Sequence, residues 1–61
     1  MNTTLQTLIQ NLREIISDIH MKYWMKEELF KGYHTVISDI STPSEYDEFR
    51  KEFEQYMNGI L

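Results

Sequence analysis

Residues 5–40 read LQTLIQNLREIISDIHMKYWMKEELFKGYHTVISDI, and this stretch carries an apolar repeat with a period of seven residues. The first heptad position holds Leu5, Leu12, Ile19, Lys26, Tyr33 and Ile40, and the fourth holds Leu8, Ile15, Lys22, Leu29 and Val36. The fifth position is also apolar, at Ile9, Ile16, Tyr23, Phe30 and Ile37. A stripe this wide predicts an all-α protein in which each helix packs against more than one neighbour.

The repeat is interrupted where Lys22 and Lys26 take apolar positions, and two architectures are compatible with this interruption. In the first, a helix from about residue 3 to residue 40 continues as a rod about 54 Å long, and two copies pair as a homodimer. In the second, Ser17 or Asp18 caps a new helix and one chain forms a monomeric three-helix bundle. A domain swap at residues 20–25 relates the two. Because this stretch has neither glycine nor proline, the pattern favours the homodimer.

Residues 41–45, STPSE, predict the start of another helix. Thr42 can act as N-cap, Pro43 has the φ angle of a first helical residue, and Glu45 completes a capping box. We therefore expect a shorter helix from about residue 43 to residue 58. The short connection requires this helix to fold back along the preceding one, so residues 1–61 form a single helical domain.

Composition excludes several classes of function. The 61 residues contain no cysteine, which removes disulfides and thiolate metal sites. No apolar run approaches the ~20 residues of a membrane span, and the first residues do not read as an export signal, so a cytoplasmic protein is expected. The six basic residues are dispersed and the net charge is −4, which argues against direct nucleic acid binding.

Residues with reactive side chains do not form a recognisable catalytic or metal-binding pattern. His20 and His34 are too far apart along a helix to share a metal ion. Ser17 lies near His20 in the sequence, and Ser38 lies near His34, but neither pair comes with a third group or an oxyanion donor. We expect no enzymatic activity, no metal and no cofactor.

Met21, Trp24 and Met25 form the best candidate for a partner-binding patch. On a continuous helix their spacing places them on the side opposite the main stripe. Tryptophan and methionine are frequent at protein interfaces, although Trp24 would be a core residue if another helix covered it. The leading prediction is therefore a small regulator or adaptor that acts by protein–protein interaction, as a homodimer.

The negative charge is concentrated at the carboxyl-terminal end of the chain. Its acidic face comprises Glu45, Asp47, Glu48, Glu52 and Glu54. A helix with this face could imitate a phosphate backbone, so the alternative prediction is an acidic inhibitor, of the kind phages and mobile elements encode, that competes with nucleic acid on a target protein. An ordinary solubilising surface explains the same residues. A purely structural oligomerisation unit is the third class.

Overall fold

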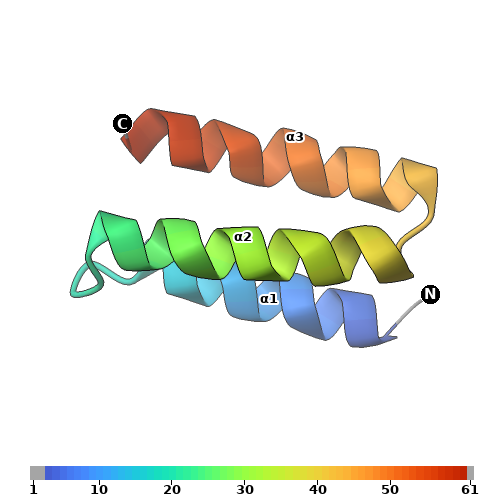
Figure 1. The fold of residues 1–61 in the computed structure, drawn as a ribbon, viewed down its shortest axis with the longest axis horizontal. Coiled ribbons are helices and arrows are strands. Elements are labelled where there is room, and N and C mark those ends of the chain that lie inside the picture. The colour runs from blue at the N-terminus through green and yellow to red at the C-terminus, as the bar shows by residue number, and fades with distance from the viewer. Residues whose placement is uncertain (1–2, 61) are drawn as a thin grey trace.

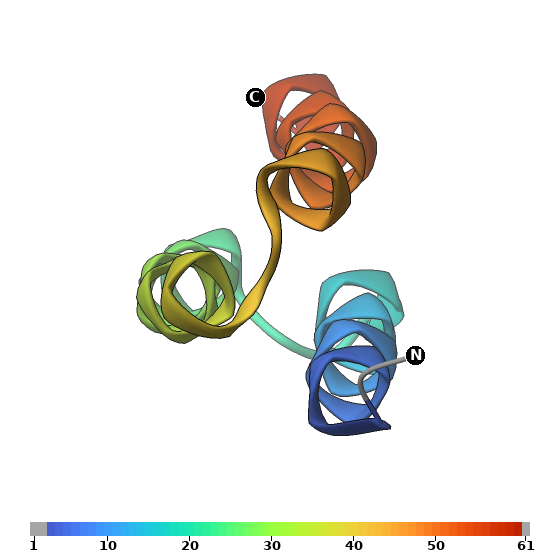
Figure 2. The ribbon, with the colours of Figure 1, turned by 90° about the vertical axis from the view of Figure 1, so that its right-hand side faces the viewer.

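The computed structural model describes the backbone of residues 3–60 and the side chains of residues 3–57. These residues form helix α1 (Thr3–Ser17), helix α2 (Tyr23–Ile40) and helix α3 (Pro43–Ile60). The helices lie side by side, and α2 runs antiparallel to both of its neighbours (Figure 1). Seen along the bundle, they occupy the corners of a triangle (Figure 2). The prediction of an all-α protein is confirmed, with three helices in the described residues.

The core is formed by apolar side chains from all three helices. It comprises Leu5, Leu12, Ile16, Ile37, Phe49, Phe53 and Met57. Leu12, Ile37 and Phe53 have no exposed surface. Burying side chains of this size stabilises the fold by about 1.5–3 kcal/mol each. Helices α2 and α3 of the same chain therefore cover apolar residues of α1 that the sequence assigned to a second copy, and homodimerisation remains a prediction.

The long or broken helix expected over residues 3–40 is broken, and it forms two helices separated by a turn. Asp18 produces this turn, because its Oδ1 accepts a hydrogen bond of 2.9 Å from the backbone N–H of His20. An Asp that binds the N–H two residues ahead offers the backbone an alternative to the helix. Asp18 thus ends the helical path, and it does not cap the next helix as the sequence suggested. The N-cap of α2 is Lys22, which makes no side-chain capping bond.

The lysine that interrupts the heptad repeat at residue 26 has a structural role. The Nζ atom of Lys26 donates a hydrogen bond of 2.7 Å to the backbone carbonyl of Ile16. The last carbonyls of a helix lack partners within the helix, so this bond satisfies one end of α1 from the start of α2. Ile19, which the heptad placed in the apolar stripe, lies in the turn and is 89% exposed.

The start of α3 follows the sequence prediction. The Thr42 N–H donates to Oε1 of Glu45 at 2.8 Å, and the Glu45 N–H donates to Oγ1 of Thr42 at 3.2 Å. These two reciprocal bonds are a complete capping box. They begin the helix at Pro43 and fix the direction in which it folds back.

Candidate functional site

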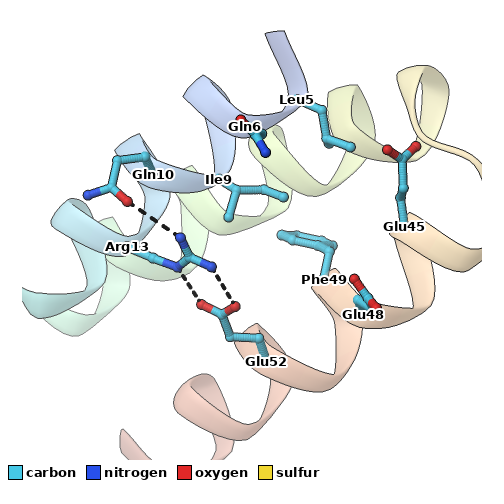
Figure 3. Close-up of a pocket in the computed structure, with 9 residues that line it drawn as sticks. All are labelled: Leu5, Gln6, Ile9, Gln10, Arg13, Glu45, Glu48, Phe49 and Glu52. Atoms are coloured by element: carbon cyan, nitrogen blue, oxygen red, sulfur yellow. Dashed lines mark hydrogen bonds and ion pairs between the residues drawn. The ribbon is translucent and has the colours of Figure 1, made fainter. Parts of the chain in front are cut away.

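A groove lies between α1 and α3 (Figure 3). Its volume is about 480 Å³. The lining residues are Leu5, Gln6, Ile9, Gln10, Arg13, Glu45, Glu48, Phe49 and Glu52. Leu5 and Phe49 are almost fully buried at its base, whereas polar side chains form its walls.

An ion pair between Arg13 and Glu52 crosses this groove (Figure 3). The Nε and second terminal nitrogen of Arg13 donate to the two carboxylate oxygens of Glu52, at 2.7 and 2.9 Å. A third nitrogen of Arg13 reaches Gln10 at 3.4 Å. The hydrogen bond from Arg13 is the main cause that lowers the pKa of Glu52, and the same bond raises the pKa of Arg13. The sequence patterns did not reveal this pair, because its members are far apart in the chain.

A second feature is an apolar face on α2 that the three-helix core does not cover. We call it the α2 face and define it as Met25, Leu29, Gly32 and Val36. Met25, Leu29 and Val36 are 39%, 37% and 48% exposed. Their spacing of four and seven residues places them on one side of the helix. Apolar side chains in such a row, left in water, are typical of a surface that binds another protein.

The α2 face borders a groove between α1 and α2. Its first part, about 280 Å³, is lined by Leu8, Glu28, Leu29, Gly32, Tyr33 and Val36. Its second part, about 330 Å³, is lined by Asn11, Glu14, Ile15, Asp18, Met21 and Tyr33. Tyr33 lines both parts, and both lie along the same two helices. We call the two parts together the α1/α2 groove.

The structure separates the three residues of the predicted patch. Met21 lies in the turn before α2, is partly buried and lines the end of the α1/α2 groove. Met25 belongs to the α2 face. Trp24 is 59% exposed, and it projects to a different side of α2 because consecutive helical residues are about 100° apart. The break in the helix separates Met21 from the other two residues, since the predicted patch assumed a continuous helix through residue 21.

The acidic face of α3 is present, but most of its charges have partners within the chain. Those partners are the Thr42 N–H for Glu45, Lys51 for Asp47 at 3.1 Å, Arg13 for Glu52, and Arg50 for Glu54 at 3.7 Å. Glu48 lines the groove between α1 and α3. A row of carboxylates that are already paired presents less free charge than the sequence suggests.

Neither serine of the two Ser–His pairs meets its histidine. The hydroxyl of Ser17 donates to the carbonyl of Glu14, and that of Ser38 donates to the carbonyl of Thr35. His34 instead lies 2.9 Å from the hydroxyl of Tyr46, through its Nε2 atom. This contact belongs to a cluster of aromatic rings between α2 and α3 that includes Phe30 and Phe49.

Within residues 3–60, no cluster of three or more His, Asp or Glu side chains has the arrangement that a metal ion requires. No helix in this part of the chain combines the length and the apolar character of a membrane span. Comparisons with known protein families, characterised proteins and solved structures find no match to this chain.

Proposed function

We propose that this chain is a small, non-enzymatic helical regulator or adaptor that acts by binding another protein. The observation that carries this proposal is the α2 face, where Met25, Leu29 and Val36 stay exposed although the chain buries a core of its own. Helix faces with apolar residues at these spacings bind protein partners by packing against a helix or inside a groove. Met21, which lines the neighbouring α1/α2 groove, extends the proposed contact area, and Trp24 offers a second exposed apolar site on another side of α2.

The remaining parts of this proposal concern chemistry, location and assembly. A role without catalysis is supported by the serine hydroxyls, which are bonded to backbone carbonyls rather than to imidazoles. A cytoplasmic location agrees with the absence of cysteine, although a chain without cysteine is compatible with any compartment. Homodimerisation stays within the proposal, and light scattering coupled to gel filtration tests it directly.

The alternative of an acidic nucleic acid competitor receives less support. It requires carboxylates on α3 that are free to replace phosphates on a basic target. Asp47, Glu52 and Glu54 instead form ion pairs with basic residues of this chain. A target would have to compete with these pairs, so the exposed apolar row is the stronger basis for a function.

An affinity capture with matched variants tests the proposal. Leu29→Lys puts a charge in the middle of the α2 face, and Ile19→Lys puts the same charge on an exposed apolar residue outside it. We expect a partner captured by the wild type and by Ile19→Lys to be lost with Leu29→Lys, while circular dichroism shows equal helicity in all three. Capture that is equal for both variants would exclude the α2 face as the binding surface.

A further inference from the structure

The α1/α2 groove contains a hole of the kind that receives a side chain from another helix. Leu29, Gly32, Tyr33 and Val36 occupy positions i, i+3, i+4 and i+7 of α2 and line the first part of the groove. In packed helices, four residues of one helix form the hole that accepts one side chain of its neighbour. Gly32 contributes no side chain to this hole, and a Cβ atom built there would lie in open space with no neighbouring atom within 4 Å.

The groove also has the length and composition that a helix needs. Leu8 of α1 forms the wall opposite Leu29 and Val36, and Ile15 continues that wall further along α1. The α2 residues that line the first part run from Glu28 to Val36, a distance of about 12 Å or about two helical turns. A helix in this position would turn the three-helix bundle into a four-helix bundle, in which each helix contacts two others.

The charge around the groove indicates what this helix carries on its flanks. Glu14, Asp18 and Glu28 line the groove, and Asp39 lies one turn beyond Val36 on the same side of α2. These four carboxylates form no ion pair with a described residue. Lys22, exposed next to Met21, and Lys26, whose ammonium lies at the Ile16 carbonyl, are the basic residues near these carboxylates, so negative charge is in excess along the rim of the groove.

The charge of this acidic rim distinguishes two candidate occupants, a second copy of the chain and a basic helix of another protein. A second copy of the chain would present the same surface in a two-fold dimer and would bring like charges together. A helix with lysine or arginine beside its apolar row would place opposite charges against Glu14, Glu28 and Asp39. Complementary charge at the edge of an apolar contact raises the rate of association and excludes wrong partners.

We propose that the α1/α2 groove binds an amphipathic helix of a partner protein that carries basic residues on both sides of its apolar row. This inference rests on the proposed function and adds the chemical class of the partner. A large apolar side chain of the partner fills the hole at Gly32, and the basic residues face the acidic rim.

A displayed library of helical peptides tests this proposal. Each peptide has apolar residues at the buried heptad positions and lysine, glutamine or glutamate, at equal starting frequency, at the flanking positions. The library is selected on the wild type, on Glu28→Gln/Asp39→Asn, which neutralises two exposed rim residues, and on Leu29→Lys. Gly32→Leu is a second blocking variant, which fills the hole with a good helix former and replaces Leu29→Lys if that variant does not fold.

The expected result is enrichment of lysine on the wild type and none on the two blocking variants. The enriched peptide should bind Glu28→Gln/Asp39→Asn about fivefold to tenfold more weakly, since each exposed charge pair contributes modestly. Its affinity for the wild type should also fall as salt rises.

Three other results would overturn the inference in distinguishable ways. Enrichment of glutamine or glutamate, with loss of binding on Leu29→Lys, would reject a basic partner and leave the proposed function standing. Enrichment that neither blocking variant affects, or no enrichment at all, would reject this inference and the proposed function together. Concentration-dependent dimers of the wild type that Leu29→Lys abolishes would assign the groove to a second copy.

Discussion

Arg13 and Glu52 are the residues that connect α1 to α3 across an open groove. Their two hydrogen bonds have the parallel geometry that makes arginine–carboxylate pairs specific. The side chains are nevertheless 49% and 31% exposed, and exposed ion pairs contribute only about 0–1 kcal/mol to stability. The pair is therefore more important for the spacing of the two helices than for the free energy of unfolding.

A double-mutant cycle with Arg13→Gln and Glu52→Gln measures this pair. We expect a coupling free energy of about 0.5–1 kcal/mol at neutral pH in urea unfolding. The folded-state pKa of Glu52 lies below its ordinary value of 4.5, so the contribution is complete above 4.5 and is lost as the pH falls through the lowered pKa. Coupling that persists unchanged under conditions that protonate Glu52 would contradict this assignment.

The hydroxyl of Tyr46 contacts Nε2 of His34 at 2.9 Å in a partly buried position between α2 and α3. Tyr46→Phe removes this hydrogen bond and keeps the ring contacts. The free energy of unfolding should therefore fall by about 0.5–1.5 kcal/mol. Tyr56→Phe is the matched control, because Tyr56 is 53% exposed and should change stability by less than about 0.5 kcal/mol. Equal losses in the two variants would mean that the Tyr46 hydroxyl has no special role.

At the scale of the element, α2 has a glycine in its interior that costs stability and leaves a hole. A Cβ atom at Gly32 would meet no atom within 4 Å, so alanine fits without displacing a neighbour. Gly32→Ala should raise the free energy of unfolding by about 0.5–1 kcal/mol, because alanine loses less backbone entropy in a helix. Chemical denaturation measures this change. A decrease in stability would show that the space above Gly32 is needed for folding.

Local signals predicted the elements better than the heptad repeat did. The capping box at Thr42 and Glu45 involves residues three apart, so its bonds follow from the sequence alone. The turn near Asp18 was one of two alternatives, and the continuous helix was favoured because the local residues are compatible with both and include neither glycine nor proline. The bond from Lys26 to the Ile16 carbonyl favours the turn over the continuous helix. This bond exists only after the two helices meet.

The residues of the α2 face were identified only in part, because their exposure depends on how the helices pack. Met25 was identified from the sequence, but its neighbours on the α2 face were assigned to the core. Leu29 and Val36 occupy fourth heptad positions, which the repeat expects to be buried, and yet both remain exposed. Gly32 between them was the available signal, since a glycine in a helix interior costs about 1 kcal/mol relative to alanine and interrupts the apolar row.

At the scale of the whole molecule, the turn at residues 18–22 decides between a chain that folds on itself and one that exchanges helices with a copy. Asp18→Ala removes the bond to the His20 N–H and introduces a strong helix former. A longer helix cannot fold back, so we expect a larger fraction of domain-swapped dimer than in the wild type.

Light scattering coupled to gel filtration over a range of protein concentrations measures this fraction. Asp39→Ala is the matched control, because it makes the same change in charge at an exposed position inside α2. If both variants form the same amount of dimer, charge rather than the turn would control association.

Lys26 couples the order of the two helix ends on either side of this turn. Its ammonium group, anchored in the opening turn of α2, closes the final turn of α1. Neither turn can lose its order without depriving the other of a bond, so the two should open in a single concerted event rather than fray one after the other. Hydrogen exchange of the backbone amides at this corner of the bundle would then report one shared free energy of opening, and Lys26→Met would split it into two.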